Sequence, residues 1–132
     1  AVITQSGLYE NEILTAYDGS DHSSKSLLVA IELAQSLGLA MTILCVAPGE
    51  PESAAAELLA DAMRTAKDHG LDARGVTGVG HPEKEILGFA QREKMDLIVM
   101  GAYGHTRIRE FVLGSTTSHV IRKSDVPVLL IR

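Results

Sequence analysis

Short apolar runs alternate with amphipathic segments along this chain of 132 residues, and the alternation restricts the folds open to it. Five apolar runs predict buried strands at 13–17, 41–46, 73–79, 96–100 and 126–131. Helical periodicity between them predicts helices over 23–37, between Pro51 and Gly70, from Pro82 onward and over 115–123. Strands that alternate with helices in this way require a parallel sheet covered on both faces. We therefore predict an α/β, Rossmann-like fold with a five-stranded parallel sheet.

The first three helices show which face each would bury. Their apolar stripes recur at helical spacing: Leu27, Ala30, Ile31, Ala34 and Leu37; Ala55, Leu59, Ala62, Met63 and Ala66; Ile86, Phe89 and Ala90. Gly38 and Gly70 follow the first two stripes, as expected at helix C-termini. The third strand is the weakest prediction, because Gly75 and Gly78 interrupt it.

A glycine-rich loop follows the fourth predicted strand. Gly101 and Gly104 are followed, after nine intervening residues, by Gly114-Ser115-Thr116 at the start of a predicted helix. Glycine lets the backbone approach an anion, and N–H groups at a helix N-terminus point toward it. The Ser115 hydroxyl is expected to cap this helix. The pattern predicts a polyphosphate pocket, although a glycine loop after a strand is also consistent with a structural turn.

The predicted fold also indicates where the pocket lies. Ligands of doubly wound sheets bind beyond the carboxyl ends of the strands, where the strand order reverses. The loops at those ends are 18–20, the segment after Val46, 80–81 and 101–115. Residues 1–11 show no periodicity and are expected to be irregular, while 12–132 form a single domain.

Three separated segments resemble the universal stress protein family, in its ATP-binding branch. They are 13–46, the glycine spacing closed by Gly114-Ser115, and the ending 124–131. The resemblance runs from about Glu12 to Arg132. It implies a nucleotide-binding fold that is often dimeric through its last strand, here Val126 to Ile131, or that pairs with a sister domain in a longer tandem chain.

The resemblance also implies roles for individual residues. Asp18 would contact the nucleoside, the Val46 backbone would meet adenine, and Met100 would flank the nucleoside. The nucleotide-binding residues expected from it and from the loop are Ala16, Tyr17, Asp18, Val46, Met100, Gly101, Gly104, His105, Arg107, Gly114, Ser115 and Thr116. Arg107 and Arg109 either add charge beside the phosphates or are solvated loop residues. The family commonly has Asp where this chain has His81, which puts a helix cap in doubt.

Other nucleotide and metal motifs are missing from the sequence. No Gly-Lys-Ser/Thr is present, so the loop is not a Walker-type P-loop, and the glycines at 75–80 lack dinucleotide-fingerprint spacing. The five histidines show no metal-ligand spacing. The expected cofactor is ATP, with Mg²⁺ bound through the phosphates. The sequence does not separate ATP from ADP or AMP.

Three functions fit these features. The first is an ATP-binding regulatory protein of the stress response, in which occupancy changes conformation or partner binding. The second is a slow ATPase or phosphotransferase, although no residue of the motif is a convincing general base, so no catalytic residue is predicted. The third is a nucleotide-free dimerisation or docking domain, which would have no need to keep the glycine positions small.

Charge and composition restrict the partners and the compartment. The net charge of −5 argues against nucleic acid or an anionic membrane as partner. No apolar run reaches the ~20 residues that span a bilayer. The single cysteine, Cys45, lies inside an apolar run, so it is expected to be buried, and a reducing cytoplasm fits best.

Overall fold

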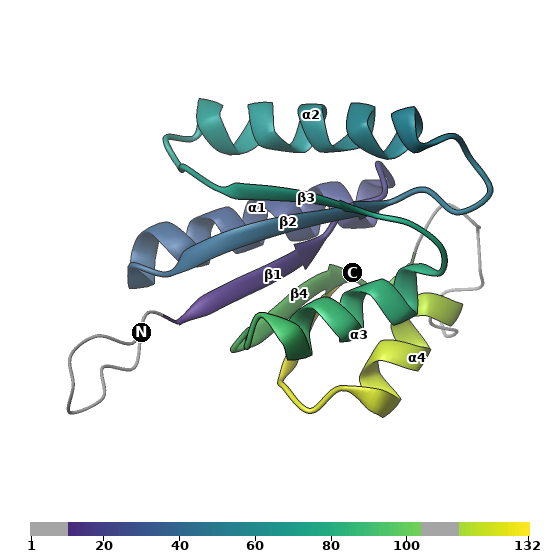
Figure 1. Ribbon diagram of the computed structural model, residues 1–132. Coiled ribbons are helices and arrows are strands. Elements are labelled where there is room, and N and C mark those ends of the chain that lie inside the picture. The colour runs from purple at the N-terminus through teal and green to yellow at the C-terminus, as the bar shows by residue number, and fades with distance from the viewer. Residues whose placement is uncertain (1–10, 104–113) are drawn as a thin grey trace.

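The computed structural model describes residues 11–103 and 114–132, and within them strands and helices alternate as predicted (Figure 1). The elements in chain order are β1 (Glu12–Ala16), α1 (Asp21–Leu37), β2 (Ala40–Val46), α2 (Glu52–Asp68), β3 (Arg74–Gly78), α3 (Pro82–Arg92), β4 (Leu97–Gly101), α4 (Ser115–Lys123) and β5 (Val128–Ile131). The predicted irregular segment at the N-terminus lies almost wholly outside the described residues, because the description begins at Asn11.

All five strands join one parallel sheet in the order β3-β2-β1-β4-β5. Leu14 of β1 stands opposite Thr42 of β2 on one side and Ile98 of β4 on the other. The chain builds outward from β1 to β3 and then crosses back to place β4 against the free side of β1. The strand order therefore reverses between β1 and β4, and the predicted α/β fold is confirmed.

Two apolar layers enclose the sheet. On one face α1 and α2 cover side chains such as Ile13 and Ile43, and on the other face α3 and α4 cover Leu14 and Ile98. Figure 1 shows α3 and α4 below the sheet and α2 above it. Successive residues of a strand face opposite sides, so β1 contributes to both layers. Each buried aliphatic side chain contributes about 1.5–3 kcal/mol to stability.

The helix ends follow from local chemistry. The Ser20 hydroxyl accepts a hydrogen bond from the Ser23 N–H at 3.2 Å, so α1 begins at Asp21, two residues before the predicted start. Gly38 ends α1 in the left-handed conformation at φ 66°, as predicted. Leu37, placed in the buried stripe of α1 by its spacing, is 50% exposed. That placement was wrong because the residue lies on the last turn of α1, after Ala34, the last buried residue of the helix.

The starts of α3 and β5 are also set by local residues. His81 occupies the N-cap of α3 without a side-chain cap bond, in line with the doubt raised by its departure from Asp, and Pro82 is the first helical residue. β5 begins at Val128 and not at Val126. The Val126 N–H donates to the Ser124 hydroxyl at 3.1 Å, and Pro127 has no N–H to give the sheet.

The two edge strands of the sheet are β3 and β5. β3 forms one edge, and a Cβ at its Gly75 would lie 3.0 Å from the Met63 sulfur of α2, so the glycine permits close helix packing. β5 forms the other edge, as the sequence predicts, and its Leu129 is 37% exposed. Cys45 lies in β2 and is fully buried in the hydrophobic core, which confirms the prediction that this cysteine is buried.

Candidate functional site

A cleft of about 650 Å³ opens at the carboxyl ends of the strands. Its walls come from the segments that follow β1, β2 and β4 and from the first turns of α2, α3 and α4. These are the loops that the sequence analysis placed beside the reversal of strand order. The reversal separates the connections that leave β1 and β4, which leaves space between them for a ligand.

The predicted site residues that the structure describes all line this one cleft. They are Ala16, Tyr17, Asp18, Val46, Met100, Gly101, Gly114, Ser115 and Thr116. The other three, Gly104, His105 and Arg107, lie outside the described residues, as does Arg109. Residues that were chosen from four separate stretches of sequence therefore meet at one surface.

Asp18 is held at the cleft by the turn between β1 and α1. Its carboxylate Oδ1 accepts a hydrogen bond from the Ser20 N–H at 2.9 Å, and its own N–H donates to the Ser23 hydroxyl at 3.3 Å. Ser23 in turn donates to the Ser20 carbonyl at 3.0 Å. This interlocked turn fixes the Asp18 backbone and satisfies the first turn of α1 with the protein's own side chains.

The start of α4 is arranged differently. Gly114 occupies the N-cap and Ser115 is the first helical residue, so the expectation that Ser115 caps this helix was wrong. Glycine has no side chain for capping, and no side chain in the described part of the chain replaces it. Ser115, Thr116 and Thr117 of the first turn of α4 line the cleft, so the positive end of the helix dipole lies at its wall.

Thr117 joins the start of α4 to the end of β4. Its buried hydroxyl donates a hydrogen bond of 2.9 Å to the Gly101 carbonyl. The Gly114 N–H also donates to the Ala102 carbonyl, at 3.1 Å. These two bonds set the position of α4 relative to the sheet, and the spacing analysis did not single out Thr117 for this role.

Gly101 is required by packing against α1. A Cβ at this position would lie 2.8 Å from both the carbonyl carbon and the Cβ of His22, closer than side-chain atoms normally approach. This contact with α1 is a packing reason for glycine at 101 that the sequence did not indicate. The sequence analysis attributed the residue to phosphate binding because the contact with α1 has no signature in local sequence.

Tyr103 and one face of α2 also line the cleft and were missed as site residues. The Tyr103 ring meets the His22 ring edge-on at 4.9 Å, and its hydroxyl accepts from Arg132 at 3.3 Å. The α2 residues that line the cleft are Ala54, Glu57, Leu58 and Asp61. Their spacing of three, four and seven residues places them on one face of the helix, but this spacing carries no signal that the face lines a cleft.

The charge of the cleft is negative over its described part. Carboxylates come from Asp18, Glu50, Glu57 and Asp61, and the described lining includes no Lys, Arg or His. Behind the cleft, burial and then the nearby charge of Asp18 raise the pKa of the Cys45 thiol to about 12. The thiol is therefore neutral at physiological pH and takes no part in the site's chemistry.

The described residues do not form a metal cage. No group of three or more His, Cys, Asp or Glu side chains in 11–103 and 114–132 is arranged to hold a metal ion. Among the same residues, no helix has the length and apolar content needed to cross a membrane.

The sheet order and the cleft at its switch point define a Rossmann-like α/β protein. The family model of the universal stress proteins matches residues 11–132. The chain belongs to the universal stress protein family.

Curated relatives agree with this assignment. The chain is 35% identical over 121 residues to universal stress protein Slr1230 of Synechocystis. This match covers 92% of the chain but 42% of Slr1230. It is 30% identical to universal stress protein YxiE of Bacillus subtilis, with 92% of the chain and 99% of YxiE covered. The chain thus spans less than half of one relative and nearly all of another.

Solved structures share the fold. Protein MJ0577 of Methanocaldococcus jannaschii superposes with a TM-score of 0.77 at 26% identity, covering 92% of this chain and 94% of that one. A universal stress protein in complex with cAMP gives a TM-score of 0.77 at 23% identity, covering 92% and 97%. The universal stress protein of Archaeoglobus fulgidus in complex with dAMP gives a TM-score of 0.71 at 24% identity, and the superposition covers 95% of this chain and 99% of that one.

Proposed function

We propose that this chain binds ATP, together with Mg²⁺, in the cleft at the carboxyl ends of β1, β2 and β4, and that occupancy regulates its conformation or its partners. The observation that carries the proposal is the meeting of the predicted residues from four stretches of sequence in one cleft of about 650 Å³. That volume lies within the ~300–1,000 Å³ typical of small-molecule sites. Two proteins of the same fold, solved with cAMP and dAMP, add support from related molecules.

The two ends of the cleft suit the two ends of a nucleotide. The phosphates would lie at the first turn of α4, whose N-cap residue, Gly114, has no side chain. The nucleoside would lie toward Asp18, Val46 and Met100, where a carboxylate and two apolar side chains line the cleft. The first turn of α1 is a poorer phosphate site, because the Ser20 hydroxyl already accepts a hydrogen bond from the Ser23 N–H of that turn.

Regulation is favoured over rapid catalysis by the role proposed for Asp18, one of the four carboxylates that line the cleft. Asp18 is oriented by the turn before α1 and is assigned to the nucleoside, so it does not serve as a general base for water. Hydrolysis is expected to be slow or absent. A steady-state turnover in the ordinary enzyme range of about 1–10³ s⁻¹ would contradict this part of the proposal.

We also propose that β5 mediates assembly, as a homodimer or with a sister domain. β5 is an edge strand with an exposed Leu129, and an apolar edge strand tends to pair with another strand. The tie between Arg132, directly after β5, and the cleft residue Tyr103 gives a physical connection between the nucleotide site and this edge. Occupancy of the cleft can thereby influence which partner the edge takes.

Direct titration tests the proposal. Nucleotide-free protein is titrated calorimetrically with ATP, AMP and GTP, with and without Mg²⁺, and phosphate release is followed in parallel. The proposal expects saturable binding of ATP that strengthens with Mg²⁺, no binding of GTP, and little phosphate release. Absence of binding by every adenine nucleotide would overturn it, and the docking-domain alternative would then take its place.

A further inference from the structure

The described walls of the cleft carry charge of the same sign as the proposed ligand. ATP without a divalent cation carries about four negative charges, and the described lining contributes four carboxylates and no basic side chain. Like charges in a cleft raise the free energy of the bound anion, and cleft walls of low dielectric strengthen the effect. The cleft must therefore discriminate among ligands by their charge as well as by their shape.

Two of these carboxylates come from one helix face. Glu57 and Asp61 are four residues apart on α2, and both line the cleft beside Ala54 and Leu58. We call Glu57 and Asp61 the α2 rim. Both residues are exposed, so neither is needed for the hydrophobic core, whose α2 contribution is Ala55, Ala62 and Ala66.

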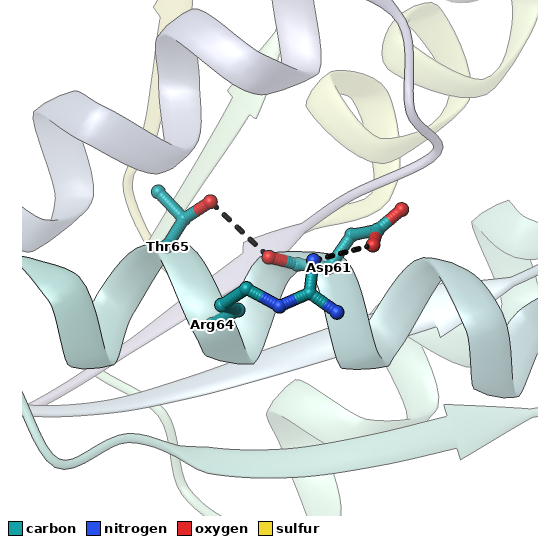
Figure 2. Close-up of polar contacts among 3 residues, drawn as sticks. All are labelled: Asp61, Arg64 and Thr65. Carbon is teal, nitrogen blue, oxygen red and sulfur yellow. Dashed lines mark hydrogen bonds and ion pairs between the residues drawn. The ribbon is translucent and has the colours of Figure 1, made fainter.

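Arg64 offsets part of this charge. Its Nη1 lies 3.1 Å from the Asp61 carboxylate Oδ1, as Figure 2 shows, while Thr65 donates to the Asp61 backbone carbonyl. The two charged side chains are 66% and 60% exposed, so the ion pair is solvated and weak. Arg64 does not itself line the cleft. The negative charges of the α2 rim and the positive charge of Arg64 together contribute to the electrostatic potential along the α2 side of the cleft.

We propose that the α2 rim is a specificity determinant that selects, among nucleotides, those whose phosphate charge is small or neutralised by a divalent cation. The inference rests on the proposed nucleotide-binding function and assigns its ligand preference to two residues outside the predicted phosphate loop. Free ATP is disfavoured relative to adenosine by the rim, and the Mg²⁺ complex of ATP, with about half the charge, is disfavoured less.

The test compares a charged ligand with an uncharged one on the same variants. Dissociation constants of adenosine, AMP and ATP are measured in EDTA at low ionic strength for the native protein, for Glu57→Gln, for Asp61→Asn and for the double variant. Neutralising the rim should tighten ATP by about threefold or more and leave adenosine nearly unchanged, with AMP between them. The gain should shrink in the presence of Mg²⁺ and at ~0.5 M salt, where screening is strong.

Two further variants separate charge from local structure. Arg64→Met removes the cation beside Asp61 and should weaken ATP relative to adenosine, which is the opposite direction. Asp68→Asn neutralises an exposed acid at the far end of the same helix, away from the cleft, and should leave the ratio of the two constants unchanged. A purely structural effect of these substitutions would move ATP and adenosine together.

The outcomes distinguish this inference from the function on which it rests. If ATP and adenosine bind but their ratio is the same in the native protein and the double variant, the rim assignment is wrong and nucleotide binding stands. If none of the three ligands binds the native protein, either in EDTA or with Mg²⁺, both the proposed function and the rim assignment are overturned. If the affinity for ATP relative to adenosine rises when the rim is neutralised and falls in Arg64→Met, the result supports both the proposed function and the rim assignment.

Discussion

The Thr117 hydroxyl donates a 2.9 Å hydrogen bond to the Gly101 carbonyl, and this buried contact connects the start of α4 with the end of β4. Two walls of the cleft meet at this bond, because β4 ends at the cleft and the first turn of α4 lines it. The distance between the sheet and the proposed phosphate site depends on this contact.

Thr117→Val removes the hydroxyl while it keeps a side chain of similar shape. The Gly101 carbonyl then loses a buried donor, which should cost about 1–3 kcal/mol of unfolding free energy and weaken nucleotide binding by displacing α4. Thr117→Ser keeps the hydroxyl and is the control. Urea denaturation and nucleotide titration of the three proteins check the prediction, and equal stability of the Val and Ser variants would contradict it.

Gly101→Ala introduces a Cβ that would lie 2.8 Å from His22 of α1. Since backbone atoms cannot move away cheaply, we expect a loss of about 1–3 kcal/mol. Gly88→Ala is the matched comparison. Its Cβ would meet only the end of the flexible Arg92 side chain at 3.1 Å, so alanine inside α3 should stabilise by about 0.5–1 kcal/mol. Opposite shifts of the two denaturation midpoints are the expected result.

Gly114→Val places a branched side chain at the N-cap of α4, on the wall of the cleft. It should abolish binding of phosphate-bearing nucleotides by blocking the approach of the phosphate to the helix end. Circular dichroism and thermal unfolding establish whether the variant is folded. A folded variant with the affinity of the native protein would remove the phosphate-site assignment.

The buried thiol of Cys45 makes stability depend on alkaline pH. Its pKa is about 12 in the folded protein, against 9.0 for the ordinary thiol. Above pH 9 the unfolded chain releases this proton and the folded chain retains it, so stability is fully present below pH 9 and is lost as pH rises toward 12. The thiol contributes a slope of up to about 1.4 kcal/mol per pH unit. Urea midpoints of Cys45→Ala should fall less steeply above pH 9 than those of the native protein.

Assembly through β5 is tested by its exposed leucine. Light scattering at ~100 μM, a concentration well above weak dimer constants, should give a dimeric mass for the native protein. Leu129→Lys should give a monomeric mass, because charge on an edge strand opposes pairing. Leu37→Lys, which alters an exposed leucine at the end of α1, should remain dimeric. A monomeric native protein would contradict the homodimer.

Most of the fold could be predicted from sequence because its determinants are local. Alternating apolar runs predict the strands, and the stripe that includes Ala30 and Ile31 predicts the buried face of α1. The predictions failed where neighbours in space decide the outcome. Leu37 fits the stripe but lies after Ala34, the last buried residue of α1, and Ser115 resembles a cap but stands one position inside the helix.

The cleft could be predicted in outline for the same reason. Asp18, Val46 and Gly114 mark strand ends and a helix start, and the topology brings those together. Glu57, Asp61 and Tyr103 could not be placed from the loop motifs, because their position depends on how α2 and α1 lie against the sheet. Only the three-dimensional arrangement shows that a solvated helix face is also a wall of the site.

The central claim, that the cleft binds an adenine nucleotide, is tested most directly by thermal unfolding of nucleotide-free protein. A ligand at 100 times its dissociation constant adds about 2.7 kcal/mol of stability, which for a chain of this size raises the midpoint by several degrees. We predict such a rise with ATP in the presence of Mg²⁺, a smaller one with AMP and none with GTP. An unchanged midpoint with every adenine nucleotide would contradict the account.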